Sequence, residues 1–537
     1  MYGNKAENLI KTKYEIINNT SPPCQTFVLK CKNGNTISLV DVFIKFKETN
    51  KLESSSKKEL KKNKFNAHIF VLEGLTKKSM YQNFPKMIEY LVKKGNTFIM
   101  NKYSAINNMT IGNSYAMFLN MSINVVRNLK KRSDIKKPDI NIYDCKKSYF
   151  DKTFIGDIFY KNNYVSLLAE NNYYSIFKNT KCIHQIQPSF NYSSFPYGKL
   201  ISFLTNHDSE YRSTYTGQCK ASFYDLLVYN QDFLKYNINK PMFSINWFSE
   251  FLNKDKDSFE RSDLALTEYF ITNSDIFDDS FVFVITDRGG TIDDNDEKIF
   301  KTIDDINPFM LVSIPSNFDK THELFKNIKY NSENTNISSF DIYASLYDIA
   351  ENIFVNSFDG ESDLLLNSLK SKSIFRSIPN RSCFNMGIDH YSCMDSYVFK
   401  TILYLPEEVL LTFQNVMLKS LNNKLKEGKI ESYCYKLQLK TNVPLKISYA
   451  LNEDNNIFWK ITITVEPGDG IFTAIFDDNL DLFYEDIKRQ NSLNTKNNTN
   501  CFVKGKYAQY CECNKEAFLK RNKKKSLKKK IIPKHKT

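Results

Sequence analysis

Residues 281–290 read FVFVITDRGG and residues 67–79 read AHIFVLEGLTKKS, and each contains a short apolar run that ends on an acid. Apolar runs of this length, rich in β-branched and aromatic residues, are typical of buried strands. In open α/β sheets, ligands bind just beyond the carboxyl ends of the parallel strands. The two acids, Asp287 and Glu73, are therefore candidate ligand-binding residues, unless they only cap the helices or loops that follow them.

Similar apolar runs recur between residues 65 and 405, where they alternate with helical spacing. We expect strands at residues 68–72, 97–100, 242–247, 281–286 and 309–314. We expect helices at residues 81–93, 258–272 and 339–350, and a helix that begins within residues 115–121. This alternation predicts an α/β domain over residues 65–405, in which helices sandwich a mostly parallel sheet.

Four further segments flank this domain. Residues 1–50 contain a short β-like segment, and residues 51–64 form a charged linker that contains serines. Residues 406–513 combine one helical stretch with alternating strand patterns, which predicts a smaller C-terminal β-rich unit with a cysteine-rich end. Residues 514–537 are rich in lysine, and we expect a basic disordered tail there.

Most of the formal net charge of +14 lies in this tail. Residues 515–537 hold eleven Lys or Arg and one acid, so they contribute +10. A basic tail can bind nucleic acid, anionic glycan or an acidic membrane surface, or it can be a solvated end without a partner. Aromatic residues are not interleaved with the basic ones, so specific nucleic-acid binding is not expected. No apolar run reaches the ~18 residues of a transmembrane helix, and none is expected in this chain.

Eleven cysteines favour an oxidising compartment. Zinc sites usually have matched cysteine pairs or histidine partners, and this pattern is missing, so a disulfide framework is the better interpretation. The disulfide candidates are Cys24, Cys31, Cys383, Cys393, Cys501, Cys511 and Cys513. Zinc remains an alternative around His390, between Cys383 and Cys393. We expect an extracellular or secretory-pathway protein whose targeting segment is missing from this sequence, because the first residues lack a signal-peptide core.

Sequons for N-glycosylation carry less weight. The pattern N-x-[ST] occurs at Asn18, Asn19, Asn108, Asn120, Asn191, Asn336, Asn380 and Asn497. In a chain this rich in asparagine, many such matches arise by chance. They are compatible with a secreted glycoprotein but do not establish one.

The order of four segments resembles a known family. FVLEGLTKKS, NNMTIGNS, FVFVITDRGG and IPNRSCFNMGIDHYSC follow one another along the chain. This set resembles the family called domain of unknown function 229, which is related to alkaline phosphatases, sulfatases and nucleotide pyrophosphatases. The resemblance spans roughly residues 65–513. It implies an alkaline-phosphatase-like fold and, for the family, metal-dependent chemistry on phosphate or sulfate esters.

The resemblance also implies roles for individual residues. The family's first metal-binding aspartate corresponds to Glu73, and its nucleophilic threonine corresponds to Thr110, with the amide of Asn113 nearby in the motif. The family's His-Asp pair is best matched by Lys254-Asp255, so the histidine is lost and Asp255 is the third candidate metal ligand.

The last family motif is altered in a way that affects the metal. Asp287 matches a ligand aspartate, but Arg288 replaces a ligand histidine. Arginine stays protonated and has no lone pair for zinc, so a two-zinc site is not expected. Two arrangements remain: one divalent cation, zinc or another, held by Glu73, Asp255 and Asp287, or no metal, with Arg288 paired to an acid and the pocket open to an anionic group.

These observations lead to three functional hypotheses. The first is a non-catalytic binding or scaffold protein outside the cell, with a degenerate metal site and a phosphate- or sulfate-bearing ligand such as an anionic glycan. The second is a weak metal-dependent hydrolase of phosphate or sulfate esters that uses Thr110 as nucleophile. The third is a nucleic-acid or membrane-surface binder that acts through its basic tail. We favour the first.

Overall fold

The computed structural model describes residues 25–33, 36–47, 64–106, 109–128, 135–141, 153–172, 175–177, 189–207, 222–249, 251, 256–289, 307–351, 368–388, 400–451, 457–483, 487–491 and 507–520. The chain divides into two compact units. Unit 1 contains the described residues up to 388, and unit 2 contains those from 400 onward.

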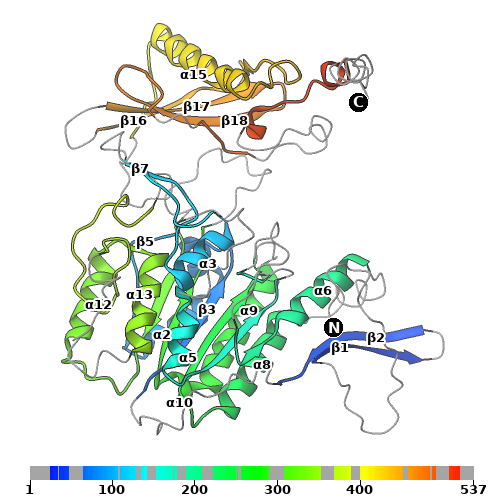
Figure 1. The fold of residues 1–537 in the computed structure, drawn as a ribbon, viewed down its shortest axis with the longest axis vertical. Coiled ribbons are helices and arrows are strands. Elements are labelled where there is room, and N and C mark those ends of the chain that lie inside the picture. The colour runs from blue at the N-terminus through cyan, green and yellow to red at the C-terminus, as the bar shows by residue number, and fades with distance from the viewer. Residues whose placement is uncertain are drawn as a thin grey trace, which may run out of the picture. The chain divides into compact units, whose positions relative to one another are not determined.

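Unit 1 is built on a seven-stranded sheet with the order β4-β12-β11-β3-β10-β8-β9. Figure 1 labels its central strand β3 and several of the helices around it. Its strands are β3 (Asn66–Leu72), β4 (Thr97–Ile99), β8 (Val165–Glu170), β9 (Tyr192–Ser193), β10 (Met242–Phe248), β11 (Ser280–Ile285) and β12 (Met310–Ser313). The pairs β11·β3, β3·β10, β10·β8 and β8·β9 are parallel, whereas β12 runs antiparallel to both of its neighbours. The sheet is therefore mostly parallel, as predicted.

Helices cover both faces of this sheet. One face packs against α3 (Thr110–Leu119), α5 (Ile155–Lys161), α12 (Glu323–Asn334) and α13 (Ser339–Ala350). The other packs against α1 (Lys77–Asn83), α2 (Pro85–Lys93), α6 (Phe195–His207), α8 (Ser222–Tyr236), α9 (Lys256–Thr272) and α10 (Ser274–Phe277). Because both faces are buried, apolar side chains point to both sides of the central strands, which also bury the polar residues His68, Ser244 and Asn246. In β3, Ile69 and Val71 point to the first layer and Phe70 and Leu72 to the second.

One predicted helix is divided in two. We expected one helix over residues 81–93, but α1 ends at Asn83 and α2 begins at Pro85. A proline disfavours the helical conformation in the residue before it and fits well at the first position of a new helix. Phe84 accordingly lies outside helical geometry, at φ −128°.

The described part of unit 1 also contains three two-stranded sheets. They pair β1 (Thr26–Asn33) with β2 (Thr36–Ile44), β5 (Tyr103–Ser104) with β13 (Ile337–Ser338), and β6 (Val126–Arg127) with β7 (Ile135–Lys136). The first of these is an antiparallel hairpin within the segment where a short β-like unit was expected.

The described part of unit 2 contains one antiparallel sheet and one long helix, α15 (Glu407–Glu427). Its six strands are β14 (Lys400–Thr401), β15 (Gln438–Leu439), β16 (Lys446–Leu451), β17 (Ile457–Glu466), β18 (Gly470–Phe476) and β19 (Lys488–Arg489). The helix buries residues spaced four apart, Phe413, Met417, Leu421 and Leu425, in a core shared with β17 and β18. This is the smaller β-rich unit that the sequence predicts.

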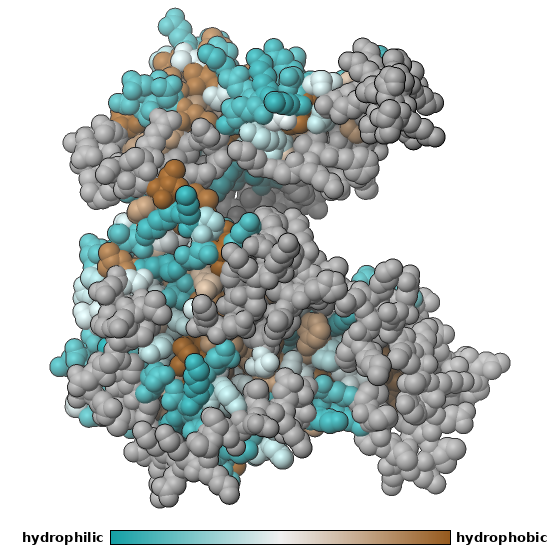
Figure 2. Space-filling view, viewed as in Figure 1, coloured by the Kyte–Doolittle hydropathy of each residue, from teal (hydrophilic) through white to brown (hydrophobic). Residues whose placement is uncertain are grey.

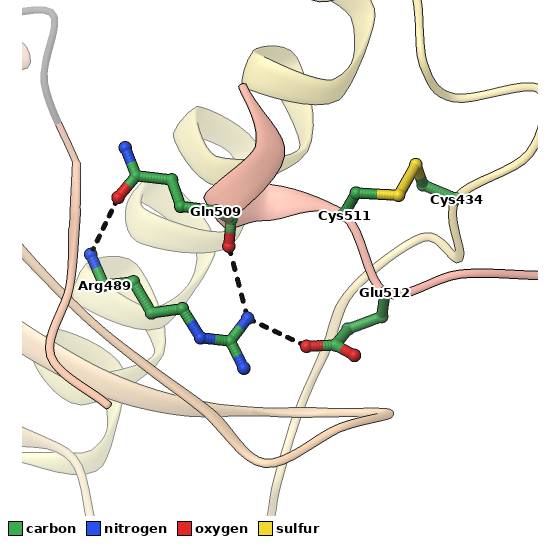
Figure 3. The surroundings of a disulfide bond; sticks show 5 residues. All are labelled: Cys434, Arg489, Gln509, Cys511 and Glu512. Atoms are coloured by element: carbon green, nitrogen blue, oxygen red, sulfur yellow. Dashed lines mark hydrogen bonds and ion pairs between the residues drawn. A yellow bond between two sulfur atoms is a disulfide. The ribbon is translucent and has the colours of Figure 1, made fainter. Parts of the chain in front are cut away.

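A disulfide between Cys434 and Cys511 fastens the end of unit 2 (Figure 3). Cys511 was a disulfide candidate, but Cys434, which precedes it by 77 residues, was not. Closing a loop of this length restricts the unfolded chain and contributes about 4.5 kcal/mol in the chain-entropy account. Cys383 and Cys513 are also disulfide-bonded. Cys24, Cys393 and Cys501 lie outside the described residues, and so does His390.

The rest of the C-terminal segment is only partly described. Residues 515–520, at the start of the expected basic tail, are helical, after the 3₁₀ turn η4 (Ala508–Tyr510). Within the described ranges, no helix is long and apolar enough to cross a membrane. Hydrophilic residues occupy much of the described surface that Figure 2 shows, with apolar residues in small patches between them.

Candidate functional site

Two acids lie at the carboxyl ends of the adjacent parallel strands β3 and β11. Glu73 follows β3, and its backbone N–H donates to the Phe248 carbonyl at 2.9 Å, which continues the pairing with β10 by one residue. Asp287 follows β11 by two residues, and its Oδ1 accepts from the backbone N–H of Gly74 at 2.9 Å. The strand pairing therefore holds both carboxylates at one edge of the sheet, the edge where α/β proteins bind ligands.

Thr110 reaches this edge from the first turn of α3. Its hydroxyl donates to Glu73 Oε1 at 2.6 Å. We expected the helix to begin within residues 115–121, but α3 begins at Thr110. Gly112 and Asn113 are poor helix formers, but both are fully buried in the packed unit, and tertiary packing overrides their propensity. The early start places the hydroxyl at a helix N-terminus, next to a carboxylate that the helix dipole also favours.

The indole of Trp247 provides the second anchor of Glu73. Its Nε1–H donates to Glu73 Oε2 at 3.0 Å from the end of β10. Both oxygens of Glu73 therefore accept hydrogen bonds from neutral donors. This carboxylate is held in one position before any ligand is considered.

Arg288 lies against both acids. Its Nη2 is 3.3 Å from Glu73 Oε1, and its Nε is 3.6 Å from Asp287 Oδ2. The Arg288 side chain is 17% exposed, whereas that of Asp287 is completely buried. A fixed positive charge thus lies between two carboxylates and still reaches the surface.

Burial controls the protonation of Asp287. Desolvation, together with the nearby charge of Glu73, raises the pKa of Asp287 to about 7. The Arg288 charge, the Gly74 N–H and the nearby Thr110 hydroxyl oppose this rise in pKa without cancelling it. Asp287 Oδ2 accepts no hydrogen bond from the described residues, so the protonated form is not disfavoured there.

Comparison with known protein families identifies the family of this chain. A family model described as "Protein of unknown function (DUF229)" matches residues 2–443. The chain belongs to this family. No curated protein matches the sequence of this DUF229 chain.

Solved structures align with the DUF229 chain at low identity. The lipoteichoic acid synthase LtaP from Listeria monocytogenes is 11% identical, with a TM-score of 0.34, over 88% of this chain and 94% of LtaP. A protein of the alkaline phosphatase superfamily from Vibrio parahaemolyticus is 12% identical, with a TM-score of 0.35, over 86% of this chain and 88% of that one. The PsFucS1 sulfatase from Pseudoalteromonas sp. is 9% identical, with a TM-score of 0.36, over 75% of this chain and 84% of the sulfatase.

The candidate site residues of the DUF229 chain separate into three groups. Glu73, Thr110, Asp287 and Arg288 lie together. Asn113 is buried, its Oδ1 accepts from the Ile106 N–H at 3.0 Å and its Nδ2 donates to the Met109 carbonyl at 3.2 Å, so these contacts shape the loop before α3. Asp255 lies outside the described residues.

Two residues near the site were not assigned from the sequence. Trp247 is the anchor of Glu73, and Glu170 ends β8 beside Trp247 in register. Burial raises the pKa of Glu170 to about 7, although the Ile176 N–H and the Ser175 hydroxyl lower it. Residues 165–170 read VSLLAE, an apolar run that ends on an acid, so the rule that found Glu73 and Asp287 could also have found Glu170.

The described part of the DUF229 site does not fit a divalent cation. No group of three or more His, Cys, Asp or Glu side chains that could hold a metal occurs among the described residues. Glu73 already accepts from Thr110 and Trp247, and the Arg288 guanidinium lies beside both acids where a cation would have to bind. A guanidinium cannot act as a ligand and would repel a dication.

Proposed function

We propose that this DUF229 protein is a non-catalytic binding protein of the secretory pathway or cell exterior, in which Arg288 takes the place of a catalytic metal. The observation that carries the proposal is the position of the Arg288 guanidinium, 3.3 Å from Glu73 and 3.6 Å from Asp287. An arginine there supplies positive charge without an ion. It does not supply the Lewis acidity or the activated water that metal-dependent ester hydrolysis requires.

The same group suggests the class of ligand. A guanidinium has five N–H donors in a planar fork that suits phosphate and sulfate oxygens. The partial exposure of Arg288 gives an anionic group access to the guanidinium. The ion pairs with Glu73 and Asp287 fix the position of the arginine side chain. We propose a phosphate- or sulfate-bearing ligand, and among macromolecules an anionic glycan.

The disulfide supports the proposed location. Stable disulfides persist in secreted and lumenal proteins and are rare in reducing compartments. Cys434–Cys511 joins the loop after α15 to the C-terminal segment of unit 2. A glycoprotein of the secretory pathway is consistent with this bond.

The first experiment measures metal content and hydrolysis together. Protein from a secretory host is analysed for bound elements and assayed with aryl phosphate, phosphodiester and aryl sulfate substrates, with Thr110→Ala as the matched control. We expect far less than one metal ion per chain and no turnover that distinguishes the two proteins. Near-stoichiometric zinc, with turnover that disappears in Thr110→Ala, would overturn the proposal.

The second experiment tests binding directly. Calorimetry with inorganic sulfate, inorganic phosphate and a sulfated oligosaccharide should show binding that Arg288→Gln weakens at least tenfold. Arg261, an exposed arginine of α9, provides the control variant Arg261→Gln, which should bind like the parent. Equal binding by the parent and Arg288→Gln would exclude the guanidinium as the ligand contact.

One contact favours an alternative function, a weak hydrolase of phosphate or sulfate esters with Thr110 as nucleophile. The 2.6 Å hydrogen bond from the Thr110 hydroxyl to Glu73 gives this hydroxyl a carboxylate that could accept its proton. Arg288 would then stabilise negative charge on the transferred group. Because the described residues do not fit a divalent cation, these groups would have to act without one. Turnover that survives a chelator, disappears in Thr110→Ala and returns in Thr110→Ser would establish this alternative.

A further inference from the structure

The tripeptide Asn380-Arg381-Ser382 is a sequon in a loop of unit 1, after Pro379, and its first and last residues are exposed. We propose that Asn380 carries an N-linked oligosaccharide, and that it is the acceptor which the fold selects from the four described sequons. This inference rests on the proposed secretory location, because the transferase acts on chains that enter that pathway.

The central arginine of this sequon orients its two functional neighbours. Arg381 is buried, and its Nη2 donates to Asp341 Oδ2 at 2.5 Å and to the Asn336 carbonyl at 3.1 Å. Asn380 and Ser382, on either side of it, are exposed. The buried ion pair therefore holds this stretch against α13, while Asn380 and Ser382 remain at the surface, where the Ser382 hydroxyl donates to Asn385 Oδ1 at 2.7 Å.

The other described sequons are hidden by the fold. Asn191 is 8% exposed, and its Oδ1 accepts from both the N–H and the hydroxyl of Ser166 at 2.9 and 3.1 Å. Asn336 is also 8% exposed, and the hydroxyl residue of its sequon, Ser338, is fully buried in the capping box of α13.

Asn120 is partly exposed, but its sequon is still occluded. It ends α3 in the left-handed conformation at φ 54°, and its side-chain Oδ1 is buried. The hydroxyl residue two positions on, Ser122, is buried as well, with its backbone N–H bonded to Asp139. The sequons at Asn18, Asn19, Asn108 and Asn497 lie outside the described residues.

The distinction matters because transfer can precede folding. A buried acceptor that received a large polar glycan would have to leave the core, at the cost of its hydrogen bonds and packing. An exposed acceptor can carry the glycan in the folded state without change. Among the four described sequons, only Asn380 combines an exposed amide with an exposed hydroxyl residue.

The reaction needs one co-reactant, a lipid-linked oligosaccharide diphosphate. The Asn380 Nδ2 attacks the anomeric carbon of the first sugar and forms a C–N bond. The C–O bond to the lipid diphosphate breaks, and the diphosphate leaves with the bonding electrons. The amide nitrogen loses one proton to a base of the transferase, so no oxidant or reductant takes part.

The test maps glycans on the full chain made with a secretion signal in insect or mammalian cells. The protein is deglycosylated with peptide N-glycosidase in ¹⁸O water, and each converted asparagine is located by mass spectrometry. Asn380 should be converted, and Asn191 should remain unmodified. Asn380→Gln and Ser382→Ala should both lose this glycan, whereas Ser382→Thr, which keeps the hydroxyl, should retain it.

The same sample shows separately whether the secretory proposal holds, through the state of Cys434 and Cys511. If Asn380 is bare while these cysteines are linked, the inference is overturned and the proposed location stands. If Asn380 is modified while the thiols are free, the inference stands and the disulfide argument for the location fails. A bare Asn380 with free thiols overturns both. A glycan on Asn191 in folded secreted protein would overturn the selection by burial.

Discussion

Each unit of the chain holds an arginine against a carboxylate, and the two sites differ in what surrounds the pair. In unit 2, Arg489 Nη1 donates to Glu512 Oε1 at 2.8 Å and to the Gln509 carbonyl at 3.2 Å, and both charged side chains are nearly inaccessible (Figure 3). In unit 1, Arg288 faces two carboxylates and remains partly exposed. The first arrangement has one acid for one arginine and faces inward. The second has two acids for one arginine, and the arginine side chain is 17% exposed.

The different surroundings of the two arginines indicate how a structural ion pair can be distinguished from a binding site. Arg489 connects β19 to the residue after Cys511, so the pair and the disulfide fasten the same C-terminal segment. Around Arg288, by contrast, burial and the charge of Glu73 raise the pKa of Asp287 to about 7, and neutral donors hold Glu73. Acids with a perturbed pKa beside a partly exposed cation are more typical of functional sites than of structural ion pairs.

The largest expected effect comes from breaking the pair in unit 2. Glu512→Ala leaves the Arg489 charge buried without its carboxylate, so we expect unit 2 to lose about 3–5 kcal/mol of unfolding free energy. The chain has two tryptophans, Trp247 in unit 1 and Trp459 in unit 2. Urea unfolding in a Trp247→Phe background therefore reports on unit 2 through Trp459 fluorescence.

The matched control is Lys440→Ala. Lys440 pairs with Asp469 at 2.7 Å in the same unit, and the two side chains are 29% and 67% exposed. Exposed pairs contribute about 0–1 kcal/mol, so the control should unfold almost like the parent. If Glu512→Ala also unfolds like the parent, the Arg489–Glu512 pair does not stabilise unit 2, and the proposed difference between the two ion pairs is wrong.

The next effect is the pH dependence that Asp287 gives to unit 1. The folded pKa of Asp287 is raised from 3.8 to about 7, so between these values the folded state keeps a proton that the unfolded state releases. Stability from this group is fully present below about pH 4 and is lost as the pH rises to about 7. Asp287→Asn has no proton to release at this position, so it should not show this pH-dependent loss of stability. The unfolding free energy of the variant minus that of the parent should therefore rise by roughly 2–4 kcal/mol between pH 4 and pH 7.5.

Unfolding in a Trp459→Phe background, where Trp247 reports on unit 1, measures this difference at several pH values. Glu170 also titrates near pH 7, but it is present in both proteins and cancels in the comparison. Glu170→Gln provides the control for its own contribution. A difference between parent and Asp287→Asn that stays constant with pH would show that Asp287 is ionised throughout and that Arg288 neutralises it.

The sequence could predict the strands of this site because both faces of the sheet are buried. The expected strands at residues 68–72, 242–247 and 281–286 lie within one or two residues of β3, β10 and β11. Continuous apolar runs are a local signal, and the acids that end them are visible in the same run. The positions of Glu73 and Asp287 beyond adjacent strand ends follow from that signal plus the assumption of a parallel sheet.

The contacts that define the site could not be predicted in the same way. Trp247 and Glu73 are 174 residues apart, and they meet because β10 and β3 are neighbours in the sheet, which no local pattern specifies. The start of α3 at Thr110 depends on packing of Gly112 and Asn113 against the rest of unit 1. The Cys434–Cys511 pairing likewise depends on how the chain returns to the loop after α15. Strand order and packing are properties of the whole unit.

The smallest expected effect separates the neutral donors of unit 1 from its ion pair. Thr110→Val keeps the shape of the side chain but removes the donor to Glu73 Oε1, leaving Arg288 and Trp247 as the contacts of that carboxylate. Hydrogen bonds to charged groups contribute somewhat more than neutral ones, so we expect a loss of about 1–2 kcal/mol. Thr110→Ser retains the hydroxyl and should recover most of it. If Thr110→Val is as stable as Thr110→Ser, the hydroxyl does not hold Glu73, and the cluster in unit 1 reduces to an arginine between two acids. The contrast with unit 2 would then depend only on the excess charge and the exposure of Arg288.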